Sequence, residues 1–296
     1  MKRLSEKTTG VLVASDFAKI RYRVLYWFMF AFLLLLSIIC IFPSIWLVIS
    51  SFKDTKELLK VPPTLLPEHF NIKKVADVWQ KIDFGTHFLI SLSIIIGTLF
   101  FMFVCTGLSG YSLSRIKPIG SGVIQKLVFW SMLMPAAGGM VITFAGFVDV
   151  PILHINLMNT HIPMWLMGGG GAFNVLLFKS YFDSIDKAYL EAARIDGCGN
   201  LQAFFKIIIP LSVPIILTLT IFTVNASWGA FLWPSLIIRD NNLKPVAQVV
   251  SQLNNGVIPK DVYMMALMLM IIPTALLFCC CSKRIMGGFN LGGIKG

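Results

Sequence analysis

Charged side chains are scarce in this sequence. Only 13% of its 296 residues are Asp, Glu, Lys or Arg, whereas 56% are hydrophobic. A soluble globular domain carries about 25% charged residues, so the composition argues against such a domain and predicts a membrane protein. The net charge of +11 is divided among short clusters between apolar runs. It does not form one basic face, which argues against nucleic-acid binding.

The sequence also lacks the motifs of familiar catalytic and nucleotide sites. It contains no HExxH or GxSxG motif and no paired carboxylates inside an apolar stretch. The four glycines at 168–171 do not form a phosphate loop, because the Gly-Lys-Ser/Thr that should follow is missing. We therefore expect a non-catalytic chain with no ATP site and no cofactor of its own.

Metal sites and disulfides are not indicated either. Three of the six cysteines are consecutive, at 279–281, so on a helix they point in three directions and cannot all bind one ion. None of the six falls in an expected outer segment, which argues against a disulfide framework. The histidines lack the close spacing of metal ligands. They are His69, His87, His154 and His161.

Long apolar runs dominate what is present. Six stretches without acidic or basic residues are long enough to cross a bilayer, which takes about 20 residues. They are 24–51, 88–114, 127–148, 162–178, 207–238 and 262–282. We therefore predict an all-α membrane protein with six transmembrane helices. It has an N-terminal segment at 1–23, a six-helix transmembrane domain at 24–283 and a C-terminal tail at 284–296.

The distribution of Lys and Arg predicts the orientation. If the N-terminus is inside, 16 of these residues lie in inner segments and 9 in outer segments. This bias places both termini in the cytoplasm. Two expected outer segments are long: 53–87, which has three prolines and is expected to be an extended loop, and the polar 239–261. From their residues alone, both can contact a partner or serve as connectors.

An expected inner segment, 179–210, has the pattern of a helix, a turn and a second helix. Helix-forming residues occupy 183–195, and Gly197 and Gly199 can end that helix because glycine adopts left-handed conformations. Asn200 can cap a second helix, which bends at Pro210. Its apolar stripe consists of Leu201, Phe204, Phe205 and Ile208. From the residues alone, this hairpin at 181–205 can dock a protein or can be an amphipathic hairpin without a partner.

The same segment resembles a known motif. Glu191, Ala192, Ala193, Asp196 and Gly197, followed by Phe205, Ile208 and Pro210, resemble the EAA motif of ABC importer permeases. GLSGYSLSR at 107–115, WGAFLWP at 228–234 and GGIKG at 292–296 resemble elements of the carbohydrate (MalG-like) permeases. The sequence departs from that pattern at Asp186, Cys198 and Gly229, where relatives often have Pro, Ala and Asn.

This resemblance implies an ABC type I importer permease fold and the permease subunit of a sugar or oligosaccharide importer in the bacterial inner or plasma membrane. Such a subunit forms the translocation path with a second, MalF-like permease. It contacts an extracytoplasmic sugar-binding protein and a cytoplasmic ATPase dimer, which binds the ATP and Mg. The implied ATPase-docking residues are Glu191, Ala192, Ala193, Asp196 and Gly197. The tail residues implied to contact the ATPase are Gly292, Gly293 and Lys295.

Neutral polar and aromatic residues expected at membrane depth are candidates for the substrate path. They are Asn174, Asn225, Ser227 and Trp228. Each can instead make hydrogen bonds between helices. The near absence of charge inside the spans argues against an ion-coupled secondary transporter. Permeases for amino acids or phosphate share the EAA motif, and the 228–234 and tail elements favour sugars.

Small residues in the second span predict close helix packing. They are Gly107, Ser109 and Gly110. We expect them to face the second permease.

Overall fold

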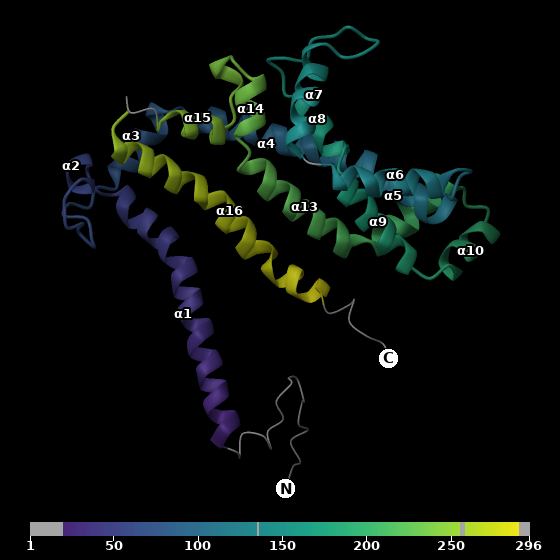
Figure 1. Cartoon of the computed structure of the whole chain (residues 1–296), viewed down its shortest axis with the longest axis horizontal. Coiled ribbons are helices and arrows are strands. Elements are labelled where there is room, and N and C mark those ends of the chain that lie inside the picture. The colour runs from purple at the N-terminus through teal and green to yellow at the C-terminus, as the bar shows by residue number, and fades with distance from the viewer. Residues whose placement is uncertain (1–19, 135, 255–257, 290–296) are drawn as a thin grey trace.

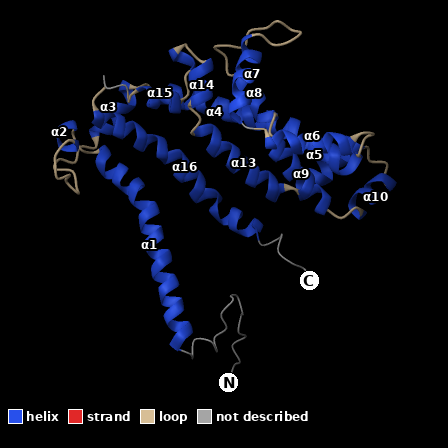
Figure 2. Ribbon diagram, in the orientation of Figure 1, coloured by secondary structure: helices blue, strands red, loops and turns tan. Residues whose placement is uncertain are grey.

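The computed structural model describes residues 20–134, 136–254 and 258–289. These residues form helices, and the only β feature among them is one antiparallel bridge between Val150 and Ile155. The all-α fold is therefore confirmed over this part of the chain (Figures 1 and 2).

Within the described ranges, three helices are each long and apolar enough to cross a membrane. The first is α1 (Ile20–Ser51), and the third is α16 (Lys260–Phe289), whose part Lys260–Cys279 has the necessary hydropathy. The second runs from Phe84 to Ile116. It comprises α4 (Phe84–Phe101), the π-helical η2 (Met102–Gly107), α5 (Leu108–Tyr111) and the π-helical η3 (Ser112–Ile116).

Two bent pairs of helices raise the number of candidate spans to five. One pair is α6 (Ser121–Leu133) and α7 (Ala136–Val148), bent by 108°. The other joins the segment Asn200–Leu211 to α13 (Val213–Trp228) with a bend of 78°. That segment comprises α11 (Asn200–Ala203), the π-helical η4 (Phe204–Ile208) and α12 (Ile209–Leu211). The bend expected near Pro210 is thus present.

Besides the bent stretch 207–238, two more of the six expected spans are not continuous helices. The stretch 127–148 is divided between α6 and α7. Met134, at the division, has φ −71° and ψ 131°, the extended conformation that a residue before proline prefers. The stretch 162–178 is divided into α8 (Ile162–Gly169) and α9 (Ala172–Ser184), because glycines occupy the break. Since α8 packs along α4 and α9 along α5, the broken helix follows the second span.

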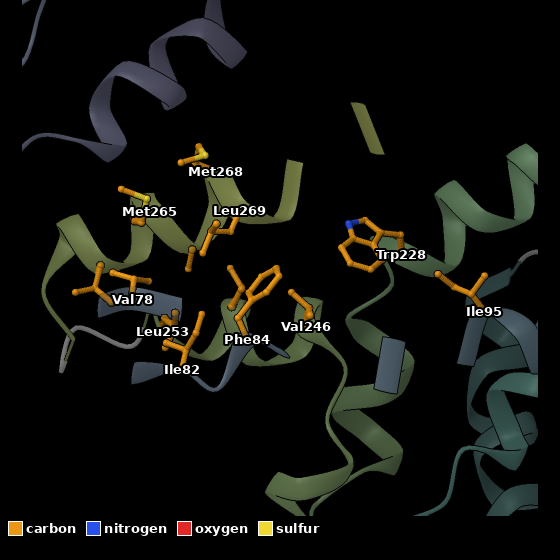
Figure 3. Close-up of a cluster of buried hydrophobic side chains, with 13 residues drawn as sticks. Val78, Ile82, Phe84, Ile95, Trp228, Val246, Leu253, Met265, Met268 and Leu269 are labelled. Carbon is orange, nitrogen blue, oxygen red and sulfur yellow. The ribbon is translucent and has the colours of Figure 1, made fainter. Parts of the chain in front are cut away.

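Both long connections contain helices, contrary to expectation. The segment 53–87 includes α2 (Thr55–Leu58) and α3 (Lys73–Lys81). The segment 239–261 includes the 3-10 turn η5 (Asn241–Leu243) and α15 (Val246–Gln252), which is largely buried. Apolar residues of α3 and α15 pack against α16 and the end of α13 in one hydrophobic cluster, shown in Figure 3. Tertiary packing therefore orders segments that their polar composition predicts to be loops.

Several short helices lie near two ends of the molecule (Figure 1). At one end, called the α3 end below, are α2, α3 and α15, and α14 (Leu232–Ile237) lies between α15 and α8. At the other, called the α10 end, is α10 (Ala188–Ile195). Helix α1 stands apart from the other helices over most of its length, and its residues at 20–45 are all exposed.

Candidate functional site

The 181–205 hairpin starts with a hydrogen bond from a side chain to the backbone. Helix α9 ends at Ser184, and the Oδ1 atom of Asp186 accepts a hydrogen bond from the backbone N–H of Ala188 at 3.0 Å. This contact satisfies one of the amides that are free at a helix start. Asp186, where many relatives have proline, therefore helps to begin α10.

The first helix of the hairpin, α10, ends at Ile195, and Gly197 supplies the predicted stop just after it. The Gly197 amide donates to the carbonyl of Arg194 at 3.0 Å, and the Cys198 amide donates to the carbonyl of Ala193 at 2.8 Å. These two bonds form a Schellman motif, whose residue after the cap adopts a left-handed conformation. Gly197 has φ +76°, and no heavy atom lies within 4 Å of the Cβ position. The backbone, and not packing within the described residues, therefore selects glycine.

The second helix differs from its prediction in two details. Gly199 is the N-cap, and Asn200 is the first residue of α11. In the apolar stripe, Phe204 and Ile208 are buried, whereas Leu201 and Phe205 are exposed. The chain is π-helical from Phe204, which spaces side chains by a wider turn than the α-helix assumed for the stripe.

The end of the second span holds the root of the hairpin. The Arg115 guanidinium donates to the backbone carbonyls of Phe182 and Ile185. The Ser114 hydroxyl donates to Asp183 Oδ1 at 2.6 Å, and the Tyr111 hydroxyl donates to the carbonyl of Asn200 at 3.1 Å. One helix end is therefore bonded both to the chain before α10 and to the start of α11.

An ion pair reinforces this root. Lys179 Nζ lies 2.7 Å from Asp183 Oδ2, one helical turn away. Burial raises the pKa of the Asp183 carboxyl, but hydrogen bonds from Lys179 and Ser114 outweigh it and hold this pKa below its ordinary value. Asp183 is therefore ionised at neutral pH.

Aromatic packing links the hairpin to the body of the protein. The ring of Phe204 lies 4.9 Å from that of Tyr111, and Phe178 stacks on Phe182 at 5.5 Å between ring centroids. Leu190 of α10 belongs to the same hydrophobic cluster. Helix α10 therefore shares one packed core with α9 and the second span.

The hairpin tip exposes most of the predicted docking residues. Glu191, Ala192, Asp196 and Gly197 are exposed. Ala193, which was also predicted to dock, is only 6% exposed. The tip also exposes large apolar side chains that were not predicted as contacts. They are Tyr189, Ile195, Leu201 and Phe205, and Ile195 is 87% exposed.

The substrate-path candidates do not share one environment. Trp228 is buried, and its indole N–H donates to the carbonyl of Met270 at 2.9 Å. Its side chain therefore joins α13 to α16, the alternative role considered for it. Asn225 is exposed on α13, and Ser227 is partly exposed. Asn174 on α9 is partly exposed and lies over the break at Gly171.

Close packing of the second span is present, but its partner differs from the expected one. A Cβ on Gly110 would lie 2.7 Å from the Phe178 Cβ and 3.0 Å from the backbone nitrogen of Lys179. Gly110 therefore packs against α9 of the same chain and not against a second permease. Gly107 has open space around its Cβ position, and Ser109 is exposed.

Two further expectations concern the C-terminal tail and metal binding. The tail residues Gly292, Gly293 and Lys295 lie outside the described residues. Among the residues that are described, no group of three or more His, Cys, Asp or Glu could hold a metal ion.

Comparison with known families gives this geometry its context. Residues 106–290, which include the whole hairpin and its anchors, match the family described as binding-protein-dependent transport system inner membrane component. The chain belongs to this family. It is accordingly a multi-pass membrane protein, in agreement with its apolar helices.

Similar proteins extend the likeness over nearly the whole chain. The polygalacturonan/rhamnogalacturonan transport system permease protein YtcP of Bacillus subtilis is 28% identical over 90% of this chain and 96% of its own length. The diacetylchitobiose uptake system permease protein NgcG of Streptomyces coelicolor is also 28% identical, over 90% of this chain and 87% of its own. The arabinooligosaccharides transport system permease protein AraQ of Halalkalibacterium halodurans is 26% identical over 92% of this chain and 98% of its own length.

A solved structure has the same fold. A chain of a bacterial ABC transporter involved in the import of the acidic polysaccharide alginate superposes with a TM-score of 0.77. The match covers 93% of this chain and 99% of that one, at 22% identity. The likeness establishes an ABC importer permease fold for this chain.

Proposed function

We propose that this chain is the transmembrane permease subunit of an ATP-driven ABC importer for a sugar or oligosaccharide. Family membership supports a transport role, and the named relatives transport saccharides. The proposed subunit is non-catalytic. ATP and Mg bind to a separate ATPase dimer, and the translocation path is shared with a second, MalF-like permease.

The hairpin tip is the observation that carries the ATPase-docking part. It combines the carboxylates of Glu191 and Asp196 with exposed apolar side chains at one end of the molecule (Figure 1). No ion pair or hydrogen bond to the Glu191 carboxylate occurs within the described part of the chain. A carboxylate beside apolar side chains suits a partner that offers a basic residue and an apolar cleft.

The proposed orientation follows from this docking. The α10 end faces the cytoplasm of a bacterial cell, together with both termini and the tail residues Gly292, Gly293 and Lys295. The α3 end, including η5 and α15, faces the extracytoplasmic sugar-binding protein. In this proposal the broken α8–α9 helix serves as one of six membrane crossings. Asn225, Ser227 and Asn174 remain candidates to line the path.

The test is assembly of the chain with a candidate second permease, ATPase and sugar-binding protein. Wild type should co-purify with the ATPase and show ATP hydrolysis stimulated by the loaded binding protein. Gly197→Asn should abolish both, because asparagine tolerates a left-handed φ but adds bulk to the exposed tip. Gly199→Ala is the matched control, since Gly199 has an ordinary φ and open space. Unchanged ATPase binding by Gly197→Asn would contradict docking at the tip.

The substrate class has its own test. The assembled complex should be stimulated by binding protein loaded with an oligosaccharide and not with an amino acid or phosphate. Stimulation by binding protein loaded with an amino acid would support the importer role but contradict a sugar as the substrate.

A further inference from the structure

The loop between α2 and α3, residues 59–72, exposes apolar side chains, whereas charged side chains that flank it are buried. Large apolar side chains project from it: Val61 is 94% exposed and Leu65 is 76% exposed. Leu59, Leu66, Phe70 and Ile72 are also exposed. An exposed apolar surface of this size on a short loop indicates contact with an apolar medium or a partner.

Two charged side chains that precede the loop are buried. Lys53 is only 2% exposed, and its ammonium group donates to the carbonyl of Thr64 and lies 4.4 Å from the ring centroid of Trp46. Buried Glu57 accepts hydrogen bonds from the Thr64 hydroxyl at 2.6 Å and from the Glu68 amide at 3.1 Å. Thr64 and the Glu68 amide of the loop therefore bond inward to the charged side chains that precede the loop.

Lys74 completes this interior. Its ammonium group donates to the carbonyl of Lys53 at 2.6 Å and lies 3.2 Å from the carboxylate of Asp261, at the start of α16. Of the ionisable side chains in 59–72 itself, Lys60 and Glu68 pair with each other, and His69 is exposed. In water, burying ions while exposing apolar groups is unfavourable twice over. At a membrane interface the same arrangement is favourable.

We propose that the 59–72 loop is embedded in the interfacial layer of the bilayer leaflet at the α3 end, which is the outer leaflet in the orientation proposed above. The loop is an extension of a membrane-spanning surface. Phe70 packs on Phe52 with ring centroids 4.5 Å apart, and Lys53 contacts Trp46 of α1. The loop is thus fastened to the last turn of a helix whose residues at 20–45 are all exposed.

Lipid fits this surface better than a protein. The loop lies at the edge of the molecule beside the end of α1 (Figure 1). Its apolar surface continues onto α3 as an open groove lined by Ile72, Val75 and Trp79. Exposed aromatic rings together with charged groups are typical of the membrane–water interface. Here Phe70 and Trp79 are exposed, as is the Lys60–Glu68 ion pair of the loop. A lipid surface accepts such a mixture without shape complementarity.

Spin labels in the assembled importer test this directly. A chain with its six cysteines replaced, and with stimulated ATPase activity retained, receives a label through Leu65→Cys, or through Val61→Cys if the first fails to assemble. Asp77→Cys, exposed on α3 at the same end, is the matched control. The complex is reconstituted in phosphatidylcholine vesicles. Collision rates with oxygen, which concentrates in lipid, and with a water-soluble nickel chelate are then measured.

We expect a several-fold higher oxygen-to-nickel ratio at Leu65 than at Asp77. Bimane attached at Leu65→Cys should also be quenched by lipids brominated near the headgroup. A nickel-dominated signal at Leu65 would show a water-exposed loop and overturn the proposal. An immobile label shielded from both reagents would also overturn it, because a protein partner would then cover the loop. Neither result bears on the proposed importer function, because ATPase stimulation, measured on the same samples, tests that function separately.

Discussion

Two connecting segments of this protein place their charges in opposite ways. In the segment 52–74, Lys53 and Glu57 are buried and apolar side chains point outward. In the 181–205 hairpin, Glu191 and Asp196 are exposed, whereas Leu190 and Phe204 are buried. Each segment follows an apolar helix. The interior of the 52–74 segment is polar, whereas the interior of the hairpin is apolar.

This difference teaches what each segment contacts. A buried ion is tolerated only where hydrogen bonds compensate its lost hydration, as they do for Lys53 and Glu57. A segment that meets this condition while exposing leucines is built for an apolar medium. The hairpin buries its apolar face in the ordinary way and keeps its carboxylates in water. Its exposed Ile195 and Leu201 then indicate a protein partner.

The largest expected effect concerns the interior of the 52–74 segment. Lys53→Met removes a buried donor and leaves the Thr64 carbonyl without it, so we expect a loss of about 2 kcal/mol of stability. Thermal unfolding of the chain in lipid nanodiscs measures it. Lys60→Met is the control, because the exposed Lys60–Glu68 pair should contribute less than about 1 kcal/mol. Equal effects would mean that the two lysines share one environment.

The turn of the hairpin should show the next largest effect. Gly197→Ala forces a side chain into φ +76°, which costs about 1–2 kcal/mol. Hydrogen exchange of the amides at 195–199 should report the loosened turn. Gly199→Ala should leave exchange unchanged, because Gly199 has φ −71°. Equal exchange in the two variants would exclude a backbone requirement at Gly197.

The root of the hairpin predicts a small pH dependence. The pKa of Asp183 is lowered in the folded state by its bonds to Lys179 and Ser114, which outweigh burial. Its contribution is therefore present above the unfolded pKa, about 3.9, and lost as the pH falls through the folded value. Because Asp183 is partly exposed, we expect under about 1 kcal/mol. Melting curves should separate Asp183→Asn from wild type at pH 7 and converge below pH 4. Curves that stay apart at low pH would refute this linkage.

Glu191→Gln should have the smallest effect on stability, within about 0.5 kcal/mol, because its carboxylate is exposed. It should nevertheless weaken co-purification with the ATPase and reduce stimulated ATP hydrolysis. Glu68→Gln serves as the control, since its exposed carboxylate pairs with Lys60 and lies at the α3 end. A destabilised Glu191→Gln chain would mean that this charge supports the fold and not a partner.

Local signals made the hairpin predictable. Glycine at 197 specifies the left-handed residue of the Schellman motif, and helix-forming residues precede it. The anchors Tyr111, Ser114 and Arg115 were within a stretch that resembles the family, but their roles were not predicted. Each bonds to a residue far away in the chain, and no spacing rule reports such a contact.

The sequence by itself determined the membrane class, the helical fold and the hairpin with its exposed carboxylates. Composition and local backbone preferences act over a few residues, so they can be read without coordinates. Only the tertiary structure decided that α15 is buried, that Ala193 and Trp228 face the interior, and that Gly110 packs on α9. It also revealed the buried lysines beneath the exposed 59–72 loop. Burial depends on which distant segments meet, and the free energy of an ion or an apolar side chain is set by those neighbours.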